Sequence, residues 1–431
     1  MQIVDNKALL LKLKNPETVT NNIQKSRVVK DGVLVNWGLY EARALNNLNI
    51  KAPSPITAQY SWPGQHKPFD HQKTTAGFLT LNHRSFCFNE QGTGKTASAI
   101  WASDYLMNKG IINRVLVICP LSIMDSAWRA DLFTFAMHRS VDVAYGSAEK
   151  RKRIIENGSD YVIINYDGVD IVRDTIAAGN FDLIIVDEAT HYKNALAKII
   201  NPKKTPRFFG SFRDMVMYKV SNFRWIPKDS ATDTVFNMLQ PAIRFTKADC
   251  LDLPDMVYTK REVELTRQQK KYYDELKKYM VLQAAGEEIT AVNAAANMNK
   301  LLQISCGAIY TDKGDALEFD VKHRYKVLRE VIDESSQKVL IFVPFRHAIS
   351  ILSDKLTTDN ISNEVIQGNV SAPRRTEIFK AFQEKEDPQV LVIQPAAAAH
   401  GVTLTAANTV VWWGPTSSLE TYSQANARVH R

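Results

Sequence analysis

Cysteines and long apolar runs are both scarce in this sequence. The only cysteines are Cys87, Cys119, Cys250 and Cys306, and no two of them form a CxxC pair. Neither a zinc site nor a disulfide framework is therefore indicated, and reduced thiols in a cytosolic setting are expected. No apolar run approaches the roughly 18 residues of a membrane-spanning helix, and the N-terminus lacks the apolar core of a signal peptide. We therefore predict a soluble cytoplasmic protein with no membrane partner.

Composition and charge set broad limits on the class of protein. The chain has 431 residues, of which 45% are hydrophobic and 23% are charged. These values are typical of a globular protein with room for two or three domains. The formal net charge is +8 and the isoelectric point is near 9.1. This mild basic excess permits a polyanionic partner but does not identify one.

A glycine-bearing turn joins a short apolar run to a helix-forming sequence between Phe86 and Trp101. Gly92 and Gly94 have no Cβ, so backbone N–H groups can turn inward around an anion. This is the layout of a phosphate-binding loop, in which the lysine would reach the β- and γ-phosphates of a nucleotide. The predicted nucleotide-binding residues of the loop are Gly92, Thr93, Gly94, Lys95 and Thr96.

The loop departs from the strict pattern at its first position. The pattern has glycine where this chain has Asn89. Taken alone, the segment is also compatible with a glycine-rich turn before a surface helix. If the loop does bind a nucleotide, the Thr96 hydroxyl would hold Mg²⁺.

A second motif places two carboxylates at the end of an apolar run. The run from Phe181 to Val186 is followed directly by Asp187 and Glu188. An unbroken run rich in β-branched residues predicts a buried strand, so the two acids would lie at its carboxyl end, where open α/β sheets bind ligands. Asp187 would anchor Mg²⁺ and Glu188 would polarise the attacking water as general base. The alternative, a strand end with solvated acids, is disfavoured by the phosphate loop upstream.

Strand-like and helix-like segments alternate from the phosphate loop onward. Alternation at this spacing predicts βαβ units and parallel sheets. Because the apolar runs fall into two series, we predict an α/β fold with two tandem parallel-sheet lobes. The runs are 115–119, 161–164 and 183–186, then 339–343, 390–393 and 409–412.

We divide the chain into three parts. Residues 1–60 are predicted to form a small N-terminal module and linker, and residues 61–257 the first lobe with both motifs. Residues 258–431 are predicted to form a helical insertion and the second lobe. Within this last part, residues 265–283 are predicted to be helical, with Thr266 as a possible N-cap.

In their order and spacing, these motifs resemble those of the superfamily-two helicase-like ATPases of the Swi/Snf class, which has phage-encoded members. The likeness covers roughly residues 60–431. It implies two RecA-like lobes, ATP and Mg²⁺ as cofactors, and a host-cytoplasmic location if the chain is phage-encoded. The further segments that carry it are 115–128, 163–167, 187–194, 253–254, 265–273, 302–306, 338–342, 400–405 and 424–431.

The resemblance assigns roles to three further residues. Gln72 would read adenine, because an amide both donates and accepts hydrogen bonds. Arg428 and Arg431 would be arginine fingers from the second lobe, and a helix would place both on one face because they are three residues apart. The alternatives are a surface glutamine and solvated arginines. The predicted catalytic residues are therefore Lys95, Asp187, Glu188, Arg428 and Arg431, and the predicted Mg²⁺ ligands are Thr96 and Asp187.

The resemblance also implies a DNA partner. Residues 400–405 match the segment that lies near the DNA backbone in this class, where contacts carry no sequence information. The implied activity is DNA-dependent ATP hydrolysis that moves the protein along, or remodels, duplex or forked DNA. The basic and aromatic stretch 207–225 either contacts nucleic acid or packs as an amphipathic core, and its composition fits both.

Three departures from the class are visible. Thr190 stands where histidine is usual, and no apolar strand with a Thr-Gly-Thr-Pro motif III is found between Asn194 and Leu253. Without that central strand, the remaining strands of the first sheet should expose an edge and apolar surface. Motif VI stops at Arg431, which a truncated protein or one piece of a split gene would explain.

These departures leave two alternatives open. One is a degenerate, non-hydrolysing nucleic-acid-binding protein that keeps the architecture without motif III. The other is a different phosphate-loop enzyme, such as a small-molecule kinase, which would leave the second lobe and its arginines without a role.

Overall fold

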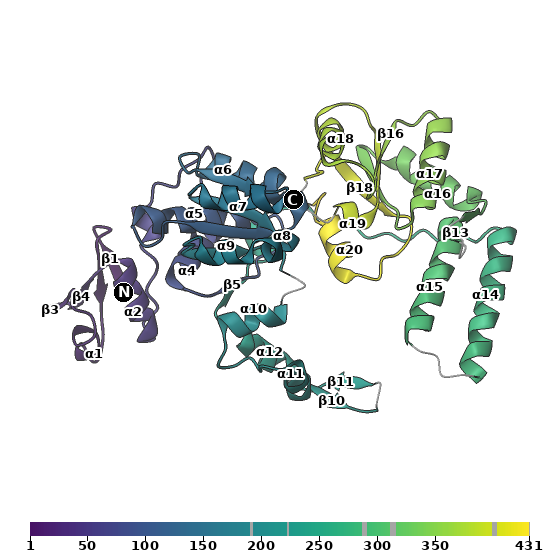
Figure 1. The fold of residues 1–431 in the computed structure, drawn as a ribbon. Helices are drawn as coiled ribbons and strands as arrows, with labels where there is room; N and C mark the ends of the chain where they lie inside the picture. Colours follow the sequence, from purple (N-terminus) through teal and green to yellow (C-terminus); the bar gives the residue numbers. More distant parts are fainter. Residues whose placement is uncertain (190–192, 222–223, 287–290, 311–315, 399–402, 431) are drawn as a thin grey trace. The chain divides into compact units, whose positions relative to one another are not determined.

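The computed structural model describes residues 1–189, 193–221, 224–286, 291–310, 316–398 and 403–430 (Figure 1). The chain divides into two compact units, Met1–Asp252 and Leu253–Arg431. In the part of the chain described, no helix is both long enough and apolar enough to cross a membrane.

The first unit begins with a four-stranded antiparallel sheet in the order β1-β2-β4-β3. Leu9, Leu11, Val33 and Val35 alternate with more exposed residues along β2 and β4, so one face of the sheet is buried. This face packs in one hydrophobic cluster with α2. The elements are β1 (Gln2–Val4), β2 (Ala8–Leu11), α1 (Glu17–Thr20), β3 (Ser26–Val29), β4 (Gly32–Asn36) and α2 (Leu39–Asn47).

The rest of the first unit is organised around a parallel sheet in the order β7-β8-β6-β9. Alternate residues of β6 and β8 point to opposite faces, which pack in two separate clusters, one with α5 and α6 and the other with α7 and α9. The strands are β6 (Val115–Cys119), β7 (Val141–Ala144), β8 (Tyr161–Asn165) and β9 (Leu183–Val186). The helices are α3 (Ile56–Gln59), α4 (Asp70–Leu81), α5 (Lys95–Asn108), α6 (Ala130–Phe135), α7 (Ala148–Glu156), α8 (Tyr166–Ile171) and α9 (Arg173–Ala178), with a 3-10 turn at Leu121–Ile123 and a π-helix at Met124–Arg129.

Strand β9 lies at the edge of this sheet. Among the described residues it pairs with β6 alone, and the strand of the phosphate loop, β5 (Phe86–Cys87), pairs instead with β12 (Ala242–Ile243). Ile184 of β9 is 55% exposed, although its partner in register, Leu116 of β6, is fully buried. We expected an exposed edge in the first sheet, and β9 has one.

Between β9 and β12 the chain forms a largely helical segment that carries a β-hairpin. The hairpin strands β10 and β11 are antiparallel. Helices α11 and α12 lie near them (Figure 1). The elements are α10 (Lys193–Ile200), α11 (Phe209–Val216), β10 (Met217–Lys219), β11 (Trp225–Pro227) and α12 (Ala231–Met238), followed after β12 by α13 (Lys247–Cys250).

The second unit holds the other parallel sheet, in the order β16-β17-β15-β18. Val339 and Ile341 of β15 pack in a cluster with α16 and α17, and Leu340 and Phe342 pack in one with α18 and α20. The sheet is therefore covered by helices on both faces, as an all-parallel sheet requires. Its strands are β15 (Lys338–Phe342), β16 (Asn363–Ile366), β17 (Val390–Ile393) and β18 (Ala407–Trp412).

The predicted fold class is confirmed, with two tandem α/β lobes and a parallel sheet in each. The predicted helical insertion is the pair α14 (Arg267–Gly286) and α15 (Ala291–Cys306), which precedes the short hairpin β13 (Ala308–Tyr310) and β14 (Ala316–Glu318). The remaining helices of the second unit are α16 (Lys322–Glu334), α17 (Arg346–Thr358), α18 (Ala372–Glu384), α19 (Pro395–Ala398) and α20 (Leu419–Asn426).

Candidate active site

The predicted phosphate loop is a turn between β5 and α5. Gly92 has φ +87° and Gly94 has φ +76°, both in the left-handed region that L-residues rarely adopt. A Cβ on Gly94 would lie 2.0 Å from the Gln72 amide nitrogen, so another residue here would both strain the backbone and displace the Gln72 side chain. Helix α5 begins at the next residue, Lys95, which gives the loop the strand–turn–helix geometry that favours an anion at a helix N-terminus.

Asn89 explains why this loop departs from glycine at its first position. Its side chain is 4% exposed and makes two hydrogen bonds, donating to Thr75 Oγ1 at 2.8 Å and accepting from the Phe245 backbone N–H at 2.9 Å. A glycine would lose both bonds. The asparagine therefore joins the loop to α4 and to the chain after β12.

The segment after β12 forms hydrogen bonds with the loop, which the sequence patterns did not indicate. The Glu90 N–H donates to the Phe245 carbonyl at 2.9 Å, and the Lys247 N–H donates to the Glu90 carboxylate at 3.0 Å. Residues more than 150 positions apart thus fix the loop backbone. No local sequence signal could have revealed these contacts.

The polar side chains of the loop are held against its own backbone. Lys95 Nζ donates to the Asn89 carbonyl at 2.8 Å, and Thr93 Oγ1 donates to the Glu90 carbonyl at 2.8 Å. Thr93 is 1% exposed, so its hydroxyl serves the loop itself. Thr96 is half-buried in the first turn of α5, one residue after the lysine.

The amide of Gln72 is occupied within the protein. Its oxygen accepts from the Phe69 N–H at 3.0 Å at the start of α4, and its nitrogen donates to the Thr93 carbonyl at 3.3 Å. His71 makes a second contact to the same carbonyl at 2.9 Å. The structure therefore places Gln72 against the loop, in a role that steadies the loop backbone.

Asp187 lies directly after β9, and its carboxylate and both of its backbone groups make hydrogen bonds. Its Oδ2 accepts from the Trp128 indole N–H at 2.9 Å, and its backbone N–H donates to the Ile118 carbonyl at 2.9 Å. The Tyr166 hydroxyl donates to the Asp187 carbonyl at 2.5 Å. Trp128 belongs to the π-helix, a rare element that often occurs at functional sites. Sequence analysis missed both Trp128 as a partner of this carboxylate and Tyr166 as a partner of the Asp187 backbone.

Glu188 has an unusual backbone for its residue type. Its φ is +52°, in the left-handed region, and its N–H donates to Asp187 Oδ1 at 2.9 Å. A non-glycine residue in this region has a strained backbone, and such residues are often found at functional sites. The neighbouring Thr190 lies outside the described residues, and of Asn194 only the backbone is described.

Charges from both motifs act on the Cys87 thiol at the end of β5. Burial raises the pKa of this thiol, a hydrogen bond with the Asn89 backbone and the charge of Lys95 lower it, and the charge of Asp187 raises it. Both motifs are also anchored on β6, because α5 packs in one cluster with this strand and the Asp187 N–H donates to its Ile118 carbonyl.

The donor atoms fit a magnesium nucleotide. The Thr96 hydroxyl and the Asp187 carboxylate are the hard oxygen ligands that Mg²⁺ prefers, together with phosphates. The described residues contain no group of three or more His, Cys, Asp or Glu side chains that could hold a metal ion without such a substrate. The site thus suits an ion that arrives with a nucleotide.

In the second unit, the predicted finger Arg428 is 2% exposed. Helix α20 ends at Asn426, so Arg428 lies in the turn that follows, and its carbonyl accepts from the Leu404 N–H at 2.9 Å. The expectation of a helix at Arg428 is therefore wrong, because α20 ends before it, and whether the two arginines share a face stays a prediction. Arg431 and residues 400–402 lie outside the described residues.

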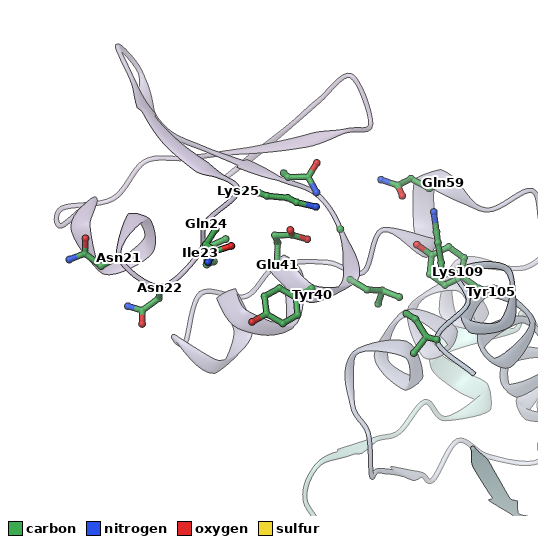
Figure 2. Close-up of a pocket in the computed structure, with 14 residues that line it drawn as sticks. Asn21, Asn22, Ile23, Gln24, Lys25, Tyr40, Glu41, Gln59, Tyr105 and Lys109 are labelled. Carbon is green, nitrogen blue, oxygen red and sulfur yellow. The ribbon is translucent and has the colours of Figure 1, made fainter. Parts of the chain in front are cut away.

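A cavity of about 610 Å³ lies elsewhere in the first unit (Figure 2). Glu41 of the N-terminal module lines it, as do Tyr105 and Lys109 near the end of α5. The Tyr105 hydroxyl is buried and has no hydrogen-bond partner. The residues that line this cavity include none of the predicted nucleotide-binding residues, so the candidate active site is separate from it.

Two protein families match this chain. Residues 35–211 match the SNF2-related domain and residues 323–431 match the helicase conserved C-terminal domain. The first match lies within the first unit and the second within the second unit.

Several known proteins are similar in sequence. A Mycoplasma genitalium protein named as an uncharacterized ATP-dependent helicase is 24% identical over 386 residues, covering 80% of this chain and 36% of its own length. Protein p41 of Acyrthosiphon pisum secondary endosymbiont phage 1 is 26% identical over 431 residues, covering 84% of this chain and 88% of that protein. The CHD3-type chromatin-remodeling factor PICKLE of Arabidopsis thaliana is 23% identical, and the match covers 80% of this chain and 30% of PICKLE. The chain therefore spans only about a third of the Mycoplasma and Arabidopsis relatives.

Among solved structures, the Sulfolobus solfataricus SWI2/SNF2 ATPase core in complex with dsDNA is 19% identical, with a TM-score of 0.39 and coverage of 82% of this chain and 83% of that chain. The two domain matches follow each other in the order that the motifs predicted. The chain therefore carries an SNF2-related domain in its first unit and a helicase conserved C-terminal domain in its second.

Proposed function

We propose that this protein is a DNA-dependent ATPase of the helicase or translocase type, which uses ATP hydrolysis to move along or remodel duplex DNA. The observation that carries the proposal is the presence in one unit of a glycine loop that opens α5 and of Asp187, whose carboxylate is held by Trp128 at the end of β9. The match to the SNF2-related domain supports the same reaction.

In this proposal the phosphate loop binds the triphosphate. The left-handed glycines Gly92 and Gly94 let backbone N–H groups face the phosphates, and α5 adds the positive end of its dipole. Lys95 exchanges its hydrogen bond to the Asn89 carbonyl for the β- and γ-phosphates. The loop keeps its shape during this exchange, because Asn89 is hydrogen-bonded to Thr75 and Gln72 is hydrogen-bonded to the Thr93 carbonyl.

The acidic pair would supply the hydrolytic chemistry. Thr96 and Asp187 would hold Mg²⁺, which neutralises charge on the phosphates when it is bound. Trp128 orients the Asp187 carboxylate and Tyr166 holds the Asp187 backbone, so the carboxylate needs little reorganisation. Glu188 would orient and deprotonate the attacking water, and its strained backbone turns it away from the line of the strand.

The second unit would supply arginine to the reacting phosphate. Arg428 and Arg431 would stabilise the charge that develops on the transferred group. The Arg428 carbonyl accepts a hydrogen bond from the N–H of Leu404, which lies within the segment 400–405 proposed to contact DNA. A movement of that segment on DNA would therefore move the Arg428 backbone through this hydrogen bond. This gives one route for coupling DNA binding to ATP turnover.

DNA is proposed as the partner because of the relatives and the charge. The similar proteins include one named as an ATP-dependent helicase and one named as a chromatin-remodeling factor. The net charge of +8 favours a polyanion. The preference between duplex and forked DNA is part of the test.

A non-hydrolysing nucleic-acid-binding protein is the second candidate. The observation that favours it is the edge position of β9, because the strand that carries Asp187 lacks a described partner on one side. In this candidate, the missing neighbour of β9 removes a link between the γ-phosphate and the DNA, so that nucleotide is bound without being hydrolysed.

The deciding experiment is the rate of ATP hydrolysis by the full chain without DNA and with single-stranded, duplex or forked DNA. We expect DNA to stimulate the rate, and Lys95→Ala and Glu188→Gln each to abolish the stimulation. A rate indifferent to DNA but responsive to a small metabolite would instead point to a kinase-like phosphate-loop enzyme. DNA binding without turnover in the wild-type chain would support the non-hydrolysing candidate.

A further inference from the structure

Exposed aromatic side chains gather on the segment that includes α11 and the hairpin β10–β11. Phe208 is 67% exposed, Phe209 is 63% exposed and Tyr218 is 55% exposed. An amphipathic core would bury these rings, so the core-packing interpretation of this stretch is wrong for them. Large apolar groups gathered at a surface indicate a binding site.

The hairpin presents its residues in a defined register. Tyr218 pairs with Ile226, and Lys219 pairs with Trp225. Directly opposed residues of antiparallel strands share a face, so Tyr218 and Ile226 lie together on one face and are 55% and 40% exposed. The opposite face of the hairpin carries Lys219 beside Trp225.

Cationic groups are stacked on the rings of this segment. The Arg213 guanidinium lies 3.8 Å from the centre of the Trp225 ring. Lys228 Nζ lies 5.3 Å from the centre of the Tyr218 ring, and the Arg207 guanidinium lies 5.6 Å from that of Phe208. Positive charges and flat rings are therefore held side by side before any partner binds.

The charge of the segment is strongly one-sided. Residues 203–228 contain seven basic side chains and one carboxylate, Asp214, which lies 3.3 Å from Arg213. A partner that only covered apolar surface would have no use for this excess, whereas a phosphate backbone would neutralise it. The basic residues are Lys203, Lys204, Arg207, Arg213, Lys219, Arg224 and Lys228.

We propose that the exposed basic and aromatic side chains of residues 203–221 and 224–228 form a surface, the hairpin surface, that binds a DNA strand with unpaired bases. The basic groups contact phosphates, and Phe208, Phe209 and Tyr218 stack against bases, which each offer a flat face regardless of sequence. The inference rests on the proposed function and extends it, because it adds a DNA contact in the first unit outside the motifs of the ATPase.

The test measures DNA affinity of the full chain at several salt concentrations, with a single-stranded oligonucleotide and a blunt duplex. The charge variant is Lys204→Gln with Lys219→Gln and Arg224→Gln, three exposed residues of the hairpin surface. Its matched control is Lys150→Gln with Lys152→Gln and Arg153→Gln, three exposed residues of α7 in the same unit.

We expect the charge variant to bind single-stranded DNA about tenfold more weakly or worse, and its plot of log affinity against log salt to be shallower by about two to three, as for the loss of three phosphate contacts. The α7 variant should keep the wild-type affinity within about twofold. A charge variant with wild-type affinity and wild-type salt dependence would overturn the proposal.

A second variant tests the rings. Phe208→Ala with Tyr218→Ala should weaken single-stranded binding by about tenfold and leave blunt-duplex binding within about twofold, because stacking requires unpaired bases. Equal losses on both DNAs would overturn the stacking role. If the wild-type chain bound no DNA and hydrolysed ATP without regard to it, the proposed function itself would fail. DNA-stimulated hydrolysis with unaltered variants would defeat only the hairpin surface.

Discussion

At the scale of single residues, side chains outside the recognised motifs hold the motif residues in place. Asn89 fixes the phosphate loop through two hydrogen bonds, and Trp128 donates to the Asp187 carboxylate. Trp128 is 1% exposed, so its indole N–H has been removed from water to reach this acceptor. A hydrogen bond from a buried donor to a carboxylate is strong. Losing the donor leaves the carboxylate charge with one hydrogen bond fewer.

We predict that Trp128→Phe damages the use of Mg²⁺ more than it damages the fold. Phenylalanine keeps most of the buried apolar surface but cannot donate to Asp187, a bond to a charged group worth about 1.5–3 kcal/mol. Turnover should fall by about tenfold, and the Mg²⁺ concentration for half-maximal activity should rise several-fold. A magnesium titration of the ATPase rate measures both.

Trp101→Phe is the matched control for this prediction. Trp101 is also 1% exposed, and its indole N–H donates to the Pro63 carbonyl at 3.0 Å, away from the acidic pair. It should lower thermal stability by a similar amount and leave the magnesium requirement unchanged. Equal shifts in the magnesium titrations of the two variants would mean that Trp128 has only a structural role.

At the scale of elements, β9 differs from the other strands of its sheet. Strands β6 and β8 are buried on both faces, whereas β9 leaves Ile184 55% exposed and has no described partner on its outer side. Unpaired strand edges are sites where further chains add. The edge therefore bears on both the stability and the solubility of the first unit.

We predict that Ile184→Ala costs less than about 1 kcal/mol of unfolding free energy, because the side chain is largely in water already. Ile163→Ala on β8 should cost about 2–5 kcal/mol, since Ile163 is fully buried and its truncation opens a cavity. Urea unfolding followed by fluorescence compares the two variants. A cost for Ile184→Ala as large as that for Ile163→Ala would show that the edge of β9 is covered in solution.

The sequence predicted elements well wherever the signal was local. Each of the apolar runs became a parallel strand, and Thr266 caps α14 through reciprocal hydrogen bonds with Gln269. Contacts between distant segments were not predictable. The sequence around Phe245 does not indicate its bond to Asn89 of the phosphate loop, and the sequence around Trp128 does not indicate its bond to Asp187. The prediction of a helix at Arg428 failed, since helical periodicity does not reveal that α20 ends at Asn426.

At the scale of the whole molecule, the proposed reaction uses residues from two units. The phosphate loop and the acidic pair belong to the first, and the predicted arginine fingers belong to the second. We therefore expect a change confined to the second unit to stop hydrolysis without removing the nucleotide. Arginine fingers contribute about 10³–10⁵ in rate to related reactions.

The most direct measurement is the ATP affinity and the DNA-stimulated turnover of Arg431→Ala in the full chain, compared with Arg374→Ala, an exposed arginine of α18 in the same unit. We predict that Arg431→Ala keeps ATP affinity within a few fold and lowers turnover by about 10³ or more, while Arg374→Ala changes neither. Wild-type turnover in Arg431→Ala, or parallel loss of binding and turnover, would contradict the claim that the second unit completes the active site.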